Sequence, residues 1–409
     1  MPVGRETHRF GWAAATPALR DRRVVNWLPL GWFNATGGLT LGLQSRSNYL
    51  GRFDLGTAQL TWPTGLGRDA SAGAVTRLRP DWYVAMRDPV RLRAPRRHTE
   101  VATWWLEGRT GARLAGEVDR SPMFEGPERR SAGADLTVMV VTDARYLDRR
   151  RWDDVNTAEL TAWAARSRDP GEGEPRASAR VALTLGEWFK PSYPPAYYLW
   201  VGPGPPPDPI GTRRLRGASY AHGVVEVGWE RPVGAFTLRW RTVAAGVLGG
   251  TSAPLQRRIG LAGADPYETF RNPFLRSGGA FLAREGVHYQ AAGGLGLRGF
   301  APTATATWGA AVNLEAGLRV LERPRLGAFS AVTVAAFADA ALLDHATLGR
   351  DGAADAGIGV RASHRIGPTR FVTRVDLPLL VSRPARAVSG AAGDGAFKFR
   401  WVWSLEEAF

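Results

Sequence analysis

The sequence predicts an all-β fold, a transmembrane antiparallel up-and-down β-barrel of about 12 to 16 strands. Alternation of apolar and polar residues recurs along most of the 409-residue chain. Glycine (49), tryptophan (16) and phenylalanine (16) are frequent, as in turn-rich β-structure. Charged residues fall in the middle of the alternating stretches and aromatic residues near their ends. That distribution is typical of strands with lipid on one side and a water-filled lumen on the other, and it differs from that of a soluble sandwich.

The last predicted strand shows the alternation most clearly. In FKFRWVWSLEEAF (397–409), one face carries Phe397, Phe399, Trp401, Trp403, Leu405 and Phe409, and the other carries Lys398, Arg400, Ser404 and Glu406. Similar faces appear in GGLTLGLQSRS (37–47), AFTLRWRT (235–242) and FVTRVDLPLLV (371–381). In these three, Leu, Phe and Trp oppose Arg, Asp, Gln or Thr. Several of the runs have about ten residues, the length that a tilted strand needs to cross a bilayer.

The same criterion places the remaining strands. They are expected at about 55–63, 99–108, 111–119, 134–146, 177–188, 220–230, 305–320, 327–341 and 354–366, and with weaker alternation near 8–14, 23–28 and 72–86. One segment, TAELTAWAARS (157–167), predicts an amphipathic helix instead.

The connections alternate between tight and long. GRTG (108–111), ERPVG (230–234) and IGPT (366–369) predict tight hairpins, and the polar stretches 147–175 and 189–217 predict outer loops. Because Pro- and Gly-rich segments fall between strands, they read as loops and not as domain linkers. We therefore expect an N-terminal linker or first-strand region at 1–36 and one barrel domain at 37–409.

Composition excludes several classes. The net charge of +15 and the isoelectric point near 10.9 come from arginines spread along the chain, and no helix-turn-helix, zinc knuckle or RNA-binding motif accompanies them. We expect no nucleic-acid partner. The most apolar segment, residues 329–343, is too short for a helical span and contains Asp339. No signal peptide is visible at the N-terminus.

Catalytic motifs are incomplete. HExxH is missing, and the six histidines show no ligand spacing. GASYAHG (217–223) has Ala221 where the nucleophile elbow needs its last glycine. GGLGLRG (293–299) fits the dinucleotide spacing GxGxxG, but a strand and not a helix follows it. We expect no enzyme activity, no metal and no cofactor.

The order of motifs in the second half carries a resemblance. LRGF (297–300) ends a long Gly-rich loop that starts near Gly249, and five predicted strands follow it. The second of these strands carries FADA (337–340), and the chain ends on the aromatic residue Phe409. This order resembles the BamA/TamA surface-antigen superfamily of bacterial outer-membrane β-barrels, which implies about 16 strands and a loop that folds back into the lumen.

The resemblance also implies roles for particular residues. Arg298, Gly299 and Phe300 match the family's loop motif. Asp339 matches the acidic partner of its arginine, in a wall motif that begins at Phe337 and has Ala341 where a glycine is expected. Glu315 matches a strand glutamate. A guanidinium can bind a carboxylate with two hydrogen bonds, so this pair would fix the loop against one wall.

The terminal strand resembles the signal by which such barrels are recognised for assembly. Its alternating aromatics Phe397, Phe399, Trp401, Trp403 and Phe409 would make the barrel-assembly machinery a partner.

A wider resemblance covers NWLPLGWFNATGGLTLGLQSRSNYLGRFD (26–54) and GADPYETFRNPFLRSGGAFL (263–282). Both look like the barrel region that follows an aminopeptidase-N-type zinc metallopeptidase in large bacterial proteins. The peptidase and the export signal would then lie upstream of Met1, and this chain alone would carry no peptidase site.

The expected function is that of an outer-membrane anchor that also takes part in protein insertion or translocation. The route would be the lumen or a seam between the first and last strands, near residues 39–43 and 397–405. Expected partners are outer-membrane lipids and lipopolysaccharide, the assembly machinery, and a client protein or an upstream peptidase domain. Two other interpretations stay open: a non-catalytic barrel module of a larger secreted zinc metallopeptidase, and a soluble all-β binding protein.

Overall fold

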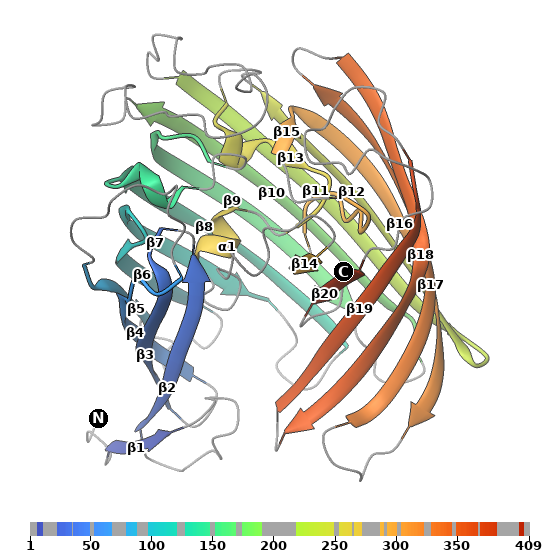
Figure 1. Ribbon diagram of the computed structural model, residues 1–409, viewed down its shortest axis with the longest axis horizontal. Coiled ribbons are helices and arrows are strands. Elements are labelled where there is room, and N and C mark those ends of the chain that lie inside the picture. The colour runs from blue at the N-terminus through green and yellow to red at the C-terminus, as the bar shows by residue number, and fades with distance from the viewer. Residues whose placement is uncertain are drawn as a thin grey trace.

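One long, strongly curved sheet forms the wall of the molecule (Figure 1). The computed structural model describes residues 6–10, 23–34, 36–49, 53–67, 79–87, 97–120, 127–147, 152–168, 174–189, 218–248, 253–263, 266–271, 287–289, 293–300, 304–322, 329–345, 349–366, 369–382 and 401–404. Of the 18 strands in this sheet, all but β1 and β14 pair antiparallel with their neighbours, which leaves 16 antiparallel strands. The predicted all-β up-and-down barrel fold is confirmed.

The strands follow one another in chain order. The first twelve are β1 (Glu6–Phe10), β2 (Arg23–Asn34), β3 (Gly38–Tyr49), β4 (Phe53–Pro63), β5 (Asp81–Arg87), β6 (Arg97–Leu106), β7 (Arg109–Asp119), β8 (Glu128–Val141), β9 (Asn156–Arg168), β10 (Arg176–Phe189), β11 (Ala218–Val233) and β12 (Phe236–Leu248). After the β12–β16 connection come β16 (Trp308–Glu322), β17 (Phe329–His345), β18 (Gly349–Ile366), β19 (Thr369–Val381) and β20 (Trp401–Ser404).

Short elements lie in the connections. The β12–β16 connection contains β13 (Ile259–Gly260), α1 (Pro266–Arg271), β14 (Val287–Tyr289) and β15 (Ala304–Ala306), with 3₁₀ turns at Leu255–Arg257 and, in the β8–β9 connection, at Ala144–Tyr146. β13 pairs with β15 in a separate two-stranded sheet. None of the helices in the described residues has the length and apolar character needed to cross a bilayer.

The up-and-down order gives the sheet two different ends. We call the end where β2 starts and β20 finishes the turn end; its connections include the tight turn at 234–235 and the two-residue connection between Ile366 and Thr369. The opposite end, the loop end, has the longest connections, residues 190–217 and 249–307.

The predicted helix at 157–167 is wrong. This segment is the strand β9, paired along its length with β8 and β10. Ala and Glu are good helix formers, but long-range strand pairing overrides such local preferences. Because β9 crosses the wall, the predicted outer loop at 147–175 is wrong as well.

The other connections need smaller corrections. The hairpin near 108–111 turns at Glu107 and Gly108, both with positive φ (42° and 70°). It lies at the loop end, whereas the β11–β12 and β18–β19 connections lie at the turn end. The outer loop predicted at 189–217 lies outside the described residues from 190 onward. Residues 39–43 are not at a seam, because β3 is paired on both sides.

The first and last wall strands form the two edges of the sheet. In the part of the chain that the structure describes, no pairing joins β2 to β20. Instead, β1 lies parallel to β2, and β14 lies parallel to β20. In Figure 1 these edges are the blue and red ends of the curved sheet.

The two faces of the wall differ in polarity. On β12, Arg239 and Arg241 are shielded on the concave side, whereas Phe236, Leu238 and Trp240 on the alternate positions are exposed. Large apolar side chains are likewise exposed on the outer positions of β4, β8, β10 and β16. The interior side therefore carries the charges and the outer side the apolar groups.

Candidate functional site

The β12–β16 connection folds back inside the curved sheet. We call its described residues from 253 to 300 the lumen loop. Its returning segment is held by two backbone hydrogen bonds, from Leu295 N to Gly260 O at 3.0 Å and from Leu297 N to Leu261 O at 2.9 Å. Leu295, Leu297 and Phe300 are buried. The inward-folded Gly-rich loop that the sequence predicts is therefore confirmed, and its packing leaves Arg298 facing the wall.

Arg298 contacts three residues of β16 and β17. Its Nη1 lies 3.2 Å from Glu315 Oε2, and its Nε lies 3.2 Å from Asp339 Oδ2. The guanidinium carbon lies 4.1 Å from the centre of the Phe337 ring. Only 4% of Arg298 is exposed. The structure thus brings together four of the residues singled out in the sequence.

The neighbours of Arg298 explain the glycines around it. Gly299 donates its N–H to Asp355 Oδ2 at 3.0 Å, and a Cβ on Gly299 would lie 2.7 Å from Val381 Cγ2. Gly296 has φ of 81°, where a Cβ would meet Arg241 Nη1 at 2.7 Å. Glycine permits both the close approach to the wall and the left-handed turn.

Glu315 is the centre of a larger ion network. Besides Arg298, it contacts Arg361 Nη2 at 2.5 Å, Arg374 Nη2 at 3.0 Å and Arg239 Nη1 at 3.5 Å. These arginines come from β18, β19 and β12. Arg374 also pairs with Asp376 at 2.5 Å. Period-two alternation places Arg239 and Arg374 on the polar face, but only strand register reveals that they meet at Glu315.

Asp339 belongs to a second chain of contacts. It accepts from Asn313 Nδ2 at 3.2 Å, and Asn313 Oδ1 accepts from Arg241 Nη1 at 3.1 Å. Arg241 continues to Glu226 at 3.0 Å and to the backbone oxygen of Gly294 at 3.2 Å. The lumen loop is therefore tied to β11, β12, β16 and β17 by one connected polar network.

The charge of Arg298 survives its burial. Burial and, after it, the nearby guanidinium of Arg374 lower the pKa of Arg298, while Asp339 and Glu315 act in the opposite direction. The ordinary arginine pKa lies so far above neutrality that the side chain stays protonated. The buried guanidinium faces two carboxylates, Glu315 and Asp339, and this arrangement holds the loop in place.

A second anchor holds the outgoing part of the lumen loop, and the sequence does not reveal it. Arg257 donates to both oxygens of Glu159 on β9, at 2.7 and 2.6 Å. Tyr220 on β11 also donates to Glu159. The Arg257 guanidinium lies 4.1 Å from the centre of the Tyr267 ring, a cation–π contact. A buried, bidentate pair of this kind fixes position in the same way as the Arg298 cluster.

The short helix α1 completes the second anchor. Tyr267 and Thr157 share a hydrogen bond of 3.1 Å between their hydroxyls, and Phe270 packs edge-on against Trp104 and Trp152. Burial and the neighbouring carboxylate of Glu159 raise the pKa of Tyr267, so its hydroxyl stays protonated at neutral pH. Backbone contacts join the same region, because Leu255 N donates to Asp153 Oδ2 at 2.8 Å.

The predicted assembly signal is only partly placed. Trp401 and Trp403 lie on β20, which pairs with β19, but their side chains are not described. Phe397, Phe399 and Phe409 lie outside the described residues. The assembly signal stays a prediction.

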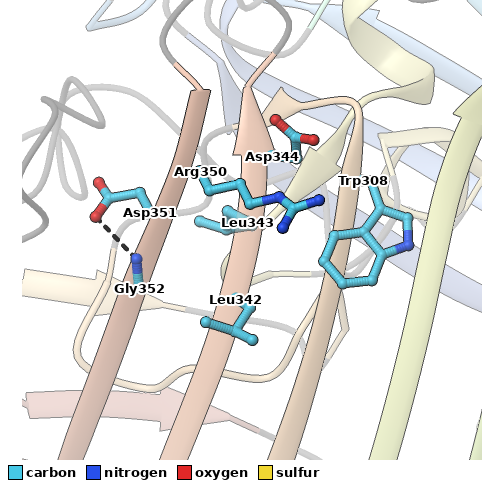
Figure 2. Close-up of a pocket in the computed structure, with 7 residues that line it drawn as sticks. All are labelled: Trp308, Leu342, Leu343, Asp344, Arg350, Asp351 and Gly352. Atoms are coloured by element: carbon cyan, nitrogen blue, oxygen red, sulfur yellow. Dashed lines mark hydrogen bonds between the residues drawn. The ribbon is translucent and has the colours of Figure 1, made fainter.

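A pocket of about 620 Å³ lies at the loop end of β16, β17 and β18, away from the Arg298 cluster. Figure 2 shows its lining. Strand register places Trp308, Asp344 and Arg350 in one row across the three strands, with Leu342 and Gly352 beside them. Among the described residues that line it, the charged ones are Asp344, Arg350 and Asp351. This set of side chains provides no matched nucleophile and base.

Comparison with known proteins identifies no family for the chain. No family model matches the sequence, and no curated protein matches it. Among solved structures, CdiB from Escherichia coli aligns at 13% identity and a TM-score of 0.47, covering 90% of this chain and 63% of that one. BamA from Haemophilus ducreyi lacking POTRA domains 1–3 aligns at 13% identity and a TM-score of 0.45, covering 93% and 72%. This chain is therefore shorter than both, and the strand pairing, not these alignments, defines its fold.

Proposed function

We propose that the chain is an outer-membrane β-barrel of bacterial surface-antigen type, which anchors in the membrane and takes part in protein insertion or translocation. The observation that carries the proposal is the inside-out polarity of the wall. Its concave side holds buried arginines and carboxylates, and its outer positions expose Leu, Val, Phe and Trp. In water this surface would be unfavourable, which argues against a soluble all-β protein.

The outer apolar surface has the height of a bilayer. On β16, the outward positions from Trp308 to Leu318 carry no charged residue. Ten residue steps of about 3.3 Å, tilted by roughly 40°, rise about 25 Å. The apolar band of a transmembrane barrel has about the same height.

Charged residues mark both edges of this band. At the loop end, Asp344 and Arg350 follow the apolar outward positions of β17 and β18. At the turn end, Arg166 follows Leu160, Ala162 and Ala164 on β9. Charges cost little near the interface and much more at the bilayer centre, so this placement agrees with a membrane-spanning wall.

The two sheet edges support a role in handling other chains. An edge strand presents unpaired backbone groups to which another strand can add. Here the edge of β20 is occupied by three residues of the chain's own β14, paired in parallel as Val287 with Trp401, His288 with Val402 and Tyr289 with Trp403. If a client strand uses this edge, β14 must leave it first.

The proposed role is non-catalytic and needs no metal, cofactor or nucleic acid. Its partners are outer-membrane lipids and lipopolysaccharide, the barrel-assembly machinery and a client protein.

A reversible lock tests the proposal. The chain has no cysteine, so His288→Cys with Val402→Cys introduces a single thiol pair across β14 and β20. The protein would be reconstituted into phospholipid vesicles, and the insertion of a urea-denatured eight-stranded outer-membrane barrel would be followed by protease protection. We expect faster insertion than in empty vesicles, loss of this gain on oxidation, and recovery on reduction.

Two further observations complete the test. The control pair Ala310→Cys with Leu342→Cys bridges the neighbouring strands β16 and β17, away from the sheet edges. Its oxidation should leave insertion unchanged. The folded protein should also migrate differently on gels before and after heating and should require detergent for extraction. Extraction without detergent would refute the membrane role, and insertion no faster than in empty vesicles would refute the insertion role.

A further inference from the structure

Two arginines face each other on the outer side of the wall at the turn end. Arg130 on β8 and Arg166 on β9 are direct partners in the antiparallel register. Their side chains are 54% and 61% exposed. Like charges placed directly opposite one another destabilise a strand pair, so this pair needs negative charge nearby.

Among the described residues, Glu128 supplies part of that charge. Glu128 lies between the two arginines, with Oε2 2.6 Å from Arg130 Nη2 and Oε1 3.0 Å from Arg166 Nη2. The register partner of Glu128 is a third arginine, Arg168. Two guanidiniums therefore contact this carboxylate and a third arginine is its register partner, so the described residues of β8 and β9 at this edge carry more arginines than carboxylates.

The surface next to these arginines is apolar and is formed by short side chains. Moving toward the loop end on the outer face, the next two pairs of β8 and β9 are Ala132 with Ala164 and Ala134 with Ala162, and all four are exposed. Leucines follow in the next row, Leu136 with Leu160. On the β10 side, Ala164 and Ala162 pair with the longer side chains of Val181 and Leu183.

This juxtaposition fits an amphiphile better than a soluble anion. Arginine binds phosphate oxygens through two parallel N–H groups. The four alanines offer an apolar surface directly beside the guanidiniums, where an acyl chain attached to the phosphate would lie. A soluble phosphate would use the arginines and leave the alanines without a role.

We propose that Arg130 and Arg166 bind the phosphate of an anionic glycerophospholipid in the leaflet at the turn end, with an acyl chain over Ala132, Ala134, Ala162 and Ala164. The site rests on the proposed membrane location of the barrel. It gives the wall a fixed lipid contact at one depth, which sets the vertical position of the barrel in the bilayer.

The test measures lipid selectivity directly. The protein would be reconstituted in phosphatidylcholine vesicles containing spin-labelled phosphatidylglycerol or spin-labelled phosphatidylcholine. The motionally restricted fraction then gives a preference ratio. The native protein should prefer phosphatidylglycerol. Arg130→Gln with Arg166→Gln should lower the ratio roughly five- to 25-fold, the effect of two cations near an anionic surface.

Matched variants separate a site from general charge. Arg231→Gln removes a single exposed arginine at the turn end of β11, whose register partner is Leu238, and should change the ratio less than about twofold, below the effect of one cation at the surface. Arg130→Lys with Arg166→Lys should retain part of the preference, because lysine keeps the charge without the planar fork. Ala164→Trp should lower the ratio without altering the charge.

Several results would overturn the proposal. One is an equal loss in Arg231→Gln, which would show a general charge effect; another is displacement of the labelled lipid by inorganic phosphate. Unchanged selectivity in the double glutamine variant would do the same. These failures differ from failure of the proposed function: a protein that shows heat-modifiable migration in vesicles without lipid preference loses only the site, whereas one that does not enter vesicles loses the membrane role.

Discussion

Glu315 pairs with arginines from four separate segments: the lumen loop and the strands β12, β18 and β19. Each of its arginines is shielded from solvent, so water cannot take the place of the carboxylate as their partner. A buried ion pair contributes little net stability, yet removing one partner costs about 3–5 kcal/mol because a charge is left uncompensated. The cluster therefore fixes the position of Arg298 more than it adds to stability.

A charge swap at Arg298 tests this role at the residue scale. Arg298→Glu places a carboxylate beside Glu315 and Asp339 and should lower the free energy of unfolding by about 3–5 kcal/mol. Adding Asp339→Arg should restore part of the loss, since one opposite-charge pair is rebuilt while Glu315 still faces a like charge. The urea midpoint of the heat-modifiable form measures both changes.

The control is Arg319→Glu, which reverses an exposed arginine paired with Glu322 at 3.1 Å. It should change the free energy of unfolding by less than about 1 kcal/mol, as surface pairs do. If Arg298→Glu is as silent as this control, the arginine does not hold the loop.

The sequence predicts some contacts of this cluster but not those that depend on strand register. The meeting of Arg298 with Asp339 follows from motif order, because the loop and the second strand after it were identified by their residues. The meeting of Arg361 with Glu315 does not, because β18 and β16 are not neighbours and their relative height depends on the pairing of β17 with both. Alternation assigns a side chain to a face and leaves its height open.

At the scale of elements, the lumen loop is held at two places on the wall. Arg298 fixes its returning end to β16 and β17, and Arg257 fixes its outgoing part to Glu159 on β9. The loop therefore crosses the interior between two anchors, and loss of one anchor leaves the other to restrict the loop.

This arrangement predicts unequal effects of single and double substitutions. Arg257→Ala and Arg298→Ala should each leave the loop resistant to limited proteolysis. The double variant should be cleaved between residues 249 and 303 at least tenfold faster than either single variant. A tenfold change corresponds to about 1.4 kcal/mol, and the loss of both buried pairs together should cost more than that. Cleavage sites mapped by mass spectrometry give the rates.

The exposed pair Arg145–Asp143, at 2.6 Å on the β8–β9 connection, supplies the control Arg145→Ala, which should not affect loop cleavage. Full release of the loop by Arg298→Ala alone would show that the Arg257 anchor has no restraining role.

β9 shows why a local sequence pattern can predict a helix where a strand forms. Its outward positions include the small residues Ala158, Ala162 and Ala164 and its inward positions include Thr157 and Thr161, so apolar–polar alternation is weak. Alanine, leucine and glutamate together favour helix locally. The strand exists because β8 and β10 supply hydrogen-bond partners over its whole length, which a local pattern cannot reveal.

At the scale of the whole molecule, two features were accessible from the sequence: the inside-out polarity and the strand count near 16. The capping of the two sheet edges by β1 and β14 was not, since β14 has three residues and no alternation. Nor did the charge of +15 identify a partner. Many of the arginines lie in internal ion networks or at the turn end, where only the fold shows their neighbours.

The two ends of the sheet also predict an orientation. The first wall strand, β2, starts at the turn end, and the last one, β20, ends there. The longest connections are at the loop end. Outer-membrane barrels have short turns on the periplasmic side and long loops outside. The loop end should therefore face the exterior.

Cysteine labelling in intact cells tests this orientation, because the chain has no native cysteine to interfere. Leu66, 65% exposed in the β4–β5 connection, lies at the loop end, and Arg120, exposed after β7, lies at the turn end. A membrane-impermeant maleimide should label Leu66→Cys in intact cells at least tenfold more than Arg120→Cys, and both equally after lysis, since the bilayer shields only the inner side. Val243→Cys, which is buried, should stay unlabelled in both conditions and controls for local opening. Labelling of Arg120→Cys alone in intact cells would reverse the orientation, and equal labelling of both would contradict a barrel that spans the membrane.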